Sequence, residues 1–314
     1  MDILWILLGV GVGIGFLALL TAYICYRMAF YAPDRKGTDD GYNFLQGEEF
    51  DPYRPAIQEW VRQVKSMPCR EFQIRSFDGL TLRGRYYEQH PGAPVELMIH
   101  GYRGDSMRDM SGGAQRAFAV GHNALIVDQR GCGRSDGNVI TFGVLESEDC
   151  VCWVRNMITW FGPDVKIILT GISMGASTVL TAAGREDLPE NVIGVLADCG
   201  YSSAKQIITN VIYGMKLPAK LLYPFVKLGA KLFARFDLEK DPPVEMMKKC
   251  RLPVVFFHGC DDTFVPPQMS EENYAACAGH KALHLIPNAG HGLSFLVDQP
   301  TYIRLAREFF HGAE

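Results

Sequence analysis

The 314-residue chain has no excess of positive charge and no cluster of cysteines or histidines with metal-ligand spacing. Its 31 basic residues are outnumbered by 35 acidic ones, and no basic stripe favours a nucleic-acid partner. Nine cysteines are scattered along the chain, and the close pair Cys150 and Cys152 lacks C-x-x-C spacing. An odd number of separated cysteines favours free thiols in a reducing compartment. We therefore expect no metal and no cofactor.

Charge is also missing from a long segment near the N-terminus. Ile3 to Tyr26 are 24 consecutive uncharged residues, enough to cross about 30 Å of hydrocarbon as a helix. A cleaved signal peptide would have a basic start and a small-x-small cleavage site, and neither is found before Arg27. The sequence predicts a transmembrane anchor over residues 1–30.

Basic residues lie on one side of this segment. Arg27, Arg35 and Lys36 follow it and none precedes it, so the positive-inside rule puts the large C-terminal part in the cytoplasm. Unpaired cysteines agree with that compartment. We expect a single-pass membrane protein whose main domain is cytoplasmic.

Residues 31–70 are predicted to be a linker with a short juxtamembrane helix. Residues 31–54 are polar and punctuated by proline and glycine, whereas residues 55–67 are amphipathic and begin with Pro55, a residue suited to the first helical position. The pattern does not decide whether this helix lies on the membrane or on the following domain.

From residue 71 the pattern becomes that of an α/β domain. Two alternating runs flank Asp78 and Gly79, which is typical of a β-hairpin. Six short apolar runs then read as buried strands, at 95–100, 124–128, 166–170, 192–197, 253–258 and 282–286. Helix-length segments separate them. The chain from 71 to 314 is therefore predicted to form a mixed, mostly parallel, doubly wound sheet.

One interval is too long for a single crossover between strands. Residues 201–250 are apolar, aromatic and lysine-rich at helical spacing, and we expect a helical insertion that forms a cap over one end of the sheet. Such a cap beside a membrane anchor suggests a site for acyl chains or lipid-like esters. A cap that only packs on the sheet is the alternative.

Two pentapeptides, at 133–137 and 171–175, fit the pattern G-x-S-x-G, in which a nucleophilic serine follows a strand and starts a helix. Gly171 directly follows an apolar strand, and a small-residue segment typical of a helix follows Ser173. Gly133 comes five residues after its strand, and no helix start follows Ser135. Ser173 is therefore the candidate nucleophile and Ser135 a loop residue.

A serine nucleophile needs a histidine base and an acid that orients the histidine. His291 lies between two glycines after the last strand and before a helix, where its loop reaches the same sheet edge as Ser173. We expect His122 at a surface or loop position. The acid is Asp262, its neighbour Asp261 or Asp198 at the end of an earlier strand. We favour Asp262, because it lies deeper in its loop.

Two backbone N–H groups are needed to stabilise the oxyanion. The amide of Met174 directly follows the candidate nucleophile, and the segment 101–104 follows the strand at 95–100. Tyr102 is the natural second donor, because Gly101 and Gly104 let this loop turn back.

Motifs in this order resemble the α/β-hydrolase family, and most closely its serine-aminopeptidase-like and monoacylglycerol-lipase-like branch and membrane-anchored bacterial hydrolases. The matching segments are SFDGLTLRGRYY, IHGYRG, DQRGCGRSDG, TGISMGAS, HGCDDTFVP and NAGHG. The resemblance implies Ser173 as nucleophile, Asp262 as acid and His291 as base, with the amides of Tyr102 and Met174 as oxyanion hole.

The function expected from these features is that of a membrane-tethered serine hydrolase with a small-molecule ester or lipid-like substrate. The bond cleaved is an ester or thioester, and the intermediate is an acyl-enzyme on Ser173. Transfer of the acyl group to an alcohol or amine, and peptidase activity, would use the same residues. A membrane-tethered scaffold without catalysis is the non-enzymatic alternative, although a scaffold has no physical need for all five groups.

Overall fold

The computed structural model describes residues 2–33 and 48–312. Within these ranges the chain forms one eight-stranded sheet in the order β1-β2-β4-β3-β5-β6-β7-β8. The β1–β2 and β2–β4 pairs are antiparallel, and the pairs from β4 to β8 are parallel. This is the mostly parallel α/β sheet that the sequence predicts.

The strands follow the hairpin and the six apolar runs of the sequence. Their bounds are β1 Arg70–Arg75, β2 Thr81–Tyr87, β3 Val95–Ile99, β4 Asn123–Asp128, β5 Ile167–Ile172, β6 Val192–Asp198, β7 Val254–Gly259 and β8 Lys281–Ile286. β3, β4 and β7 are buried along their whole length, because helices cover both faces of the sheet.

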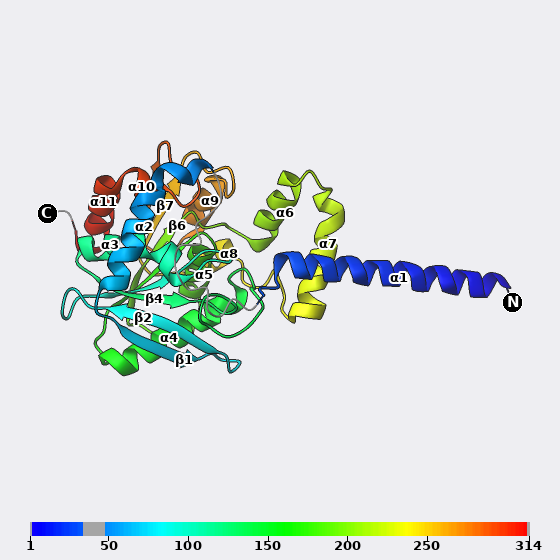
Figure 1. Ribbon diagram of the computed structural model, residues 1–314, viewed down its shortest axis with the longest axis horizontal. Helices are drawn as coiled ribbons and strands as arrows, with labels where there is room; N and C mark the ends of the chain where they lie inside the picture. The colour runs from blue at the N-terminus through cyan, green and yellow to red at the C-terminus, as the bar shows by residue number, and fades with distance from the viewer. Residues whose placement is uncertain (1, 34–47, 313–314) are drawn as a thin grey trace.

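Each face of the sheet packs against its own layer of helices. One layer contains α4 Val144–Phe161, α5 Met174–Ala183, α8 Pro243–Met247 and α9 Gln268–Ala276. The other contains α2 Arg54–Ser66, α3 Ser106–Val120, α10 Ser294–Val297 and α11 Gln299–His311. The short helix η1, Glu48–Tyr53, leads into α2. In Figure 1 α2, α3 and α11 lie together at the side of the domain away from α1.

Between β6 and β7 the chain forms α6 Ala204–Gly214, α7 Ala219–Gly229, the π-helical turn η2 Ala230–Ala234 and α8. α6 and α7 stand apart from the sheet on the side from which α1 emerges (Figure 1). Their apolar residues form a separate cluster with Phe30 and Met174. We call α6, α7 and η2 the cap.

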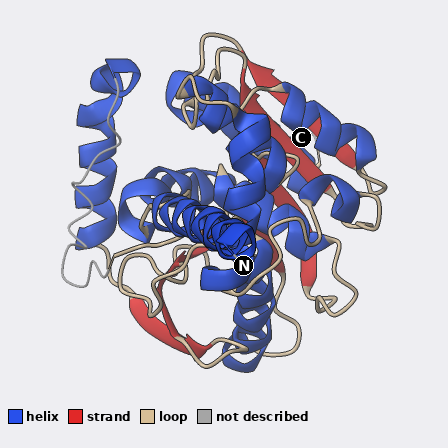
Figure 2. Ribbon diagram, turned by 90° about the vertical axis from the view of Figure 1, so that its right-hand side faces the viewer, coloured by secondary structure: helices blue, strands red, loops and turns tan. Residues whose placement is uncertain are grey.

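The N-terminal helix α1, Asp2–Ala29, projects from the domain beside the cap (Figure 1) and is seen almost end-on in Figure 2. Its segment Trp5–Ala29 is long and apolar enough to cross a membrane. The division into anchor, linker and hydrolase domain stays a prediction. Arg35 and Lys36, on which the predicted orientation partly rests, lie outside the described residues.

Candidate active site

Ser173 lies on the sharp turn that joins β5 to α5. Its φ of 55° is in the left-handed region, a conformation that costs about 1–3 kcal/mol for a residue with a side chain. A Cβ on Gly171 would come 2.2 Å from the Gly175 carbonyl oxygen, and a Cβ on Gly175 would come 2.0 Å from the Ile99 carbonyl oxygen. The two glycines therefore let the backbone approach closely enough to hold the serine at the end of the strand.

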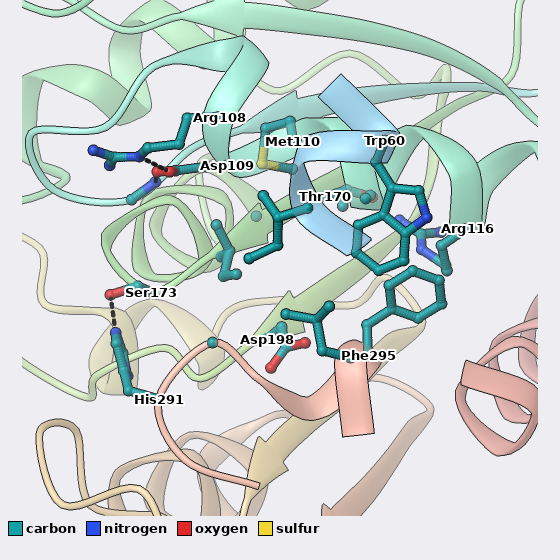
Figure 3. A pocket seen from close by; sticks show the side chains of 18 of the residues that line it. Trp60, Arg108, Asp109, Met110, Arg116, Thr170, Ser173, Asp198, His291 and Phe295 are labelled. Atoms are coloured by element: carbon teal, nitrogen blue, oxygen red, sulfur yellow. Dashed lines mark hydrogen bonds and ion pairs between the residues drawn. The ribbon is translucent and has the colours of Figure 1, made fainter. Parts of the chain in front are cut away.

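The side chains of Ser173, His291 and Asp262 form one hydrogen-bonded line. His291 Nε2 is 2.9 Å from Ser173 Oγ, and His291 Nδ1 is 2.6 Å from Asp262 Oδ2. The first of these contacts is drawn in Figure 3. An ionised carboxylate accepts a hydrogen bond from Nδ1–H, which leaves Nε2 as the acceptor for the serine hydroxyl. The arrangement can take a proton from Ser173.

Asp262 is buried and held in a network of donors. Its Oδ1 accepts the backbone N–H groups of Phe264 and Val265, and its Oδ2 is 3.1 Å from His258 Nε2. Burial alone would raise the pKa of this carboxyl, but hydrogen bonds from His258 and His291 outweigh it and lower the pKa to about 2. The group is therefore ionised at neutral pH.

The two other candidate acids lie elsewhere. Asp261 is exposed. Asp198 is buried, and it accepts hydrogen bonds from Ser294 Oγ and Tyr302 Oη, each at 3.0 Å, rather than from His291. Burial raises the pKa of Asp198 to about 6. The structure thus brings Asp262, and neither alternative, into hydrogen-bonding contact with the histidine.

The loop after β3 runs beside the serine. A Cβ on Gly101 would lie 3.7 Å from Ser173 Cβ, and the Gly101 N–H donates to Asp109 Oδ2 at 3.1 Å. Within residues 2–33 and 48–312 we find no hydrogen-bond acceptor for the backbone N–H of Tyr102 or Met174. Both amides are free to donate to a bound oxygen.

Side chains of this loop contact the end of α1, a position that the sequence left open. Tyr102 Oη donates to the Ala29 carbonyl oxygen at 2.8 Å, and Arg103 donates to the carbonyl oxygens of Met28 and Tyr31 at 2.8 and 3.1 Å. Carbonyls at a helix C-terminus lack partners within the helix, so these donors satisfy them. The candidate oxyanion loop and the N-terminal helix are thereby joined.

A cavity of about 340 Å³ opens from Ser173 and His291. In Figure 3 it extends from these residues to Trp60 and Phe295 at its far end, where the two rings stack at 5.4 Å between centroids. Its walls are mainly apolar and come from η1, α2, α3, α10 and the ends of β5 and β6. Among the described residues, none that lines this cavity belongs to 201–250. The expectation that the cap forms the acyl site is wrong for this cavity; α2 covers it instead.

Ser135, the other serine in a G-x-S-x-G pentapeptide, is buried in the loop after β4. Its Oγ donates to the Asp128 carbonyl oxygen at 2.6 Å and accepts the Arg83 N–H at 2.9 Å. These bonds tie the loop to β2 and β4. They assign Ser135 a structural position away from the cavity.

One group of possible metal ligands overlaps with the candidate catalytic residues. Donor atoms of Cys199, Asp262 and His291 lie within 4.8 Å of one another. Asp262 and His291 are already hydrogen-bonded to each other, and burial raises the pKa of Cys199 well above its ordinary value. A protonated thiol is a poor metal ligand, so the cluster fits proton transfer better than metal binding.

A family model and several known proteins are similar to this chain in sequence, and solved structures are similar to it in fold. The family model described as the alpha/beta hydrolase family matches residues 97–303. The uncharacterized protein YqkD of Bacillus subtilis is 27% identical over 250 residues, which cover 78% of this chain and 80% of that protein. Protein bem46 of Schizosaccharomyces pombe is 22% identical over 239 residues, or 74% of each chain.

Among solved structures, the esterase Pf2001 of Pyrococcus furiosus superposes with a TM-score of 0.63 at 20% identity. The match covers 85% of this chain and 95% of the esterase, and at this identity it supports the fold alone. Together with the family match, it agrees with the sheet and the strand–turn–helix at Ser173. The chain therefore belongs to the alpha/beta hydrolase family and is a hydrolase of this general class.

Proposed function

We propose that the protein is a membrane-anchored serine hydrolase that cleaves esters of medium-length acyl chains. The observation that carries the proposal is the hydrogen-bonded line Asp262–His291–Ser173 at the mouth of an apolar cavity. A thioester would react by the same steps.

The reaction begins when Ser173 Oγ attacks the acyl carbon while His291 Nε2 takes its proton. The new oxyanion accepts hydrogen bonds from the N–H groups of Tyr102 and Met174. The bond to the leaving group then breaks, and His291 returns the proton to the departing oxygen. Water, deprotonated by His291, attacks the acyl-enzyme and releases the carboxylic acid and the free serine. Asp262 stays ionised and stabilises the imidazolium.

The cavity sets the size of the acyl group. A volume of about 340 Å³ is within the range of ligand pockets, about 300–1,000 Å³, and the walls are mainly apolar, so the cavity can hold an acyl chain. We propose a medium-length chain, of about eight to ten carbons, that lies between Ser173 and the stacked rings of Trp60 and Phe295. We expect the highest kcat/KM near this length and a decline toward C16.

The catalytic assignment is tested with a fluorophosphonate probe and a series of nitrophenyl esters from C2 to C16. Ser173→Ala should abolish labelling and ester cleavage. Ser135→Ala is the matched control, since it alters the other pentapeptide serine, and it should retain labelling. Undiminished labelling of the Ser173 variant would overturn the proposal.

We further propose that α1 crosses the membrane and that the hydrolase domain faces the cytoplasm. The proposal rests on the apolar segment Trp5–Ala29 and on basic residues that follow it. The exposed thiols of Cys69 and Cys260 report the side. A membrane-impermeant maleimide should label them after cell lysis and leave them unlabelled in intact cells. Labelling in intact cells would place the domain outside.

A further inference from the structure

We propose that the outward face of α7, with the turn that precedes it, lies in the headgroup region of an anionic lipid bilayer. The bilayer is the one that α1 crosses, so the inference rests on the proposed membrane anchoring and is independent of the catalytic assignment. It gives the cap a function in membrane contact, since none of the described residues that line the cavity belongs to the cap.

α7 and the turn η2 that continues it carry apolar residues on two opposite faces. Four of them, at spacings of four, three and four, are buried in the cap cluster: Ala219, Tyr223, Val226 and Ala230. A second set with the same spacings lies about 200° around the helix and is wholly or partly exposed: Leu221, Phe225, Leu228 and Leu232. Leu221 alone is 64% exposed. An outward apolar stripe opposite a buried one indicates that something besides water covers the helix.

The turn between α6 and α7 continues this surface. Residues 213–218 are exposed without interruption. Tyr213, Met215 and Leu217 are 52%, 49% and 41% exposed. A loop tip normally carries polar residues, so three large apolar side chains here extend the stripe of α7 into one patch.

Lysines flank the apolar stripe. Lys220, Lys227 and Lys231 are exposed and, at spacings of seven and four, lie along one side of α7 and η2 between the two faces. Lys227 pairs with Glu239, so Lys220 and Lys231 are the lysines of this row that we assign to the headgroups. Lys216 adds a fourth positive charge in the turn. Such a border is typical of helices that lie in the interface of an anionic membrane, because the long side chains reach the headgroups while the apolar face enters the acyl boundary.

Contacts with α1 place α7 at the depth of the membrane interface. A Cβ on Gly229 would come 2.5 Å from the Ala22 carbonyl oxygen, and Phe233 packs on the rings of Tyr23 and Tyr26 at 5.2 and 5.7 Å. Counted from the first apolar residues, the roughly 20 needed to cross the hydrocarbon end near Ala22. Tyrosines just beyond that point are typical of the membrane interface.

The direction of α7 also agrees with a position along the membrane surface. In Figure 1 α7 is drawn across α1 rather than along it, so a helix spanning the bilayer leaves α7 lying along the membrane surface. The apolar patch meets α1 at its η2 end, where Phe233, 36% exposed, packs on Tyr23, which is 40% exposed. This contact, together with the lysines, favours lipid over a second protein as the occupant.

The test places an environment-sensitive label on the patch of the full chain. Cys69→Ser and Cys260→Ser first remove the exposed thiols. Leu221→Cys then receives a nitrobenzoxadiazole group, and the matched control carries it at Asp164→Cys. Asp164 is exposed just before β5, at the edge of the sheet opposite the cap. The parent without a new cysteine gives the background, and carbonate-resistant flotation with vesicles reports α1 separately.

In vesicles of phosphatidylcholine with phosphatidylglycerol, the label at 221 should emit at shorter wavelength than the label at 164. Nitroxide lipids should quench it at least several-fold more strongly. Lys220→Gln with Lys231→Gln should reduce the equilibrium constant for docking of the patch by about five-fold for each lysine, provided phosphatidylglycerol is present.

Three outcomes would overturn the inference while flotation persists. Equal quenching at both labels would show that the patch does not meet lipid. Equal quenching with and without phosphatidylglycerol would show that the patch does not need an anionic lipid surface. Blue-shifted emission without quenching by lipid, with energy transfer that rises with protein density, would assign the patch to a second copy. Loss of flotation would instead contradict the anchoring by α1.

Discussion

Asp198→Asn should stabilise the folded chain at neutral pH. The wild-type carboxyl is buried beside the cavity, and its pKa in the folded chain is about 6. The ordinary value is 3.8, so ionising this group in the folded state costs at most about 3 kcal/mol. Asparagine retains a polar amide for Ser294 and Tyr302 and removes the charge.

The sign of the pH dependence follows from the raised pKa. Below about pH 3.8 Asp198 is protonated in both states and contributes no penalty. As the pH rises to 6, the unfolded chain ionises first and is favoured, so this contribution to stability is lost and then stays constant. Asp198→Asn has no ionisable group at this position, so its unfolding free energy does not decrease for this reason as the pH rises.

The assay is urea unfolding of both proteins in detergent, followed by tryptophan fluorescence between pH 4 and 8. The difference in unfolding free energy, variant minus wild type, should increase by about 2 kcal/mol between pH 4 and 6 and level off above about pH 7. A pH-independent difference would refute the reasoning. Labelling of Ser173 by the fluorophosphonate should persist, because Asp198 does not contact His291 through a hydrogen bond.

Substitutions at the candidate site distinguish the groups that take part in the proposed reaction from the groups that only position them. Asp262→Asn should lower kcat for nitrophenyl esters by about 10³–10⁴-fold, whereas Asp261→Asn should leave it unchanged; similar losses in both would contradict the assignment. Trp60→Ala should extend the chain-length profile, with kcat/KM rising about four-fold for each methylene that enters the vacated space. An unaltered profile would put the acyl chain elsewhere. Tyr102→Phe removes the bond to the Ala29 carbonyl and should lower kcat by up to about five-fold with KM little changed. An effect on KM alone would argue against a loop held in place by α1.

The sheet and the turn at Ser173 could be predicted because their signals are local. Buried parallel strands need continuous apolar runs, and these are found from β3 to β7. The run at 282–286 also forms a strand, but β8 is at the edge of the sheet and only partly buried, contrary to the prediction. The glycines on either side of Ser173 are required by backbone contacts of 2.2 and 2.0 Å that a Cβ would make. The loops of Asp262 and His291 follow strands whose parallel ends converge. Order along the chain was therefore sufficient to bring these residues together.

His122 lies in a loop, between α3 and β4, as predicted, but its burial was not anticipated. Its ring is fully buried, and Nδ1 is 2.8 Å from Glu96 Oε1, while Nε2 is 2.8 Å from His311 Nε2. Glu96 also pairs with the buried Arg116, which lies 20 residues further along the chain. A single glutamate inside an apolar strand gives no sequence signal of its partners, so the buried network could not be anticipated from the pattern around His122.

The same limit explains why the sequence suggested the cap, rather than α2, as a site for acyl chains. An amphipathic pattern at 55–67 shows which side of the helix is apolar, but it does not identify the surface that covers it. In the structure Val64 of α2 packs in the cluster of α3, and Trp60 closes the far end of the cavity beside Phe295. The candidate oxyanion loop is likewise bonded to the end of α1 through Tyr102. Two separate parts of the N-terminal segment thus contact the site at its ends. This segment is therefore part of the candidate binding surface as well as the proposed connection to the membrane.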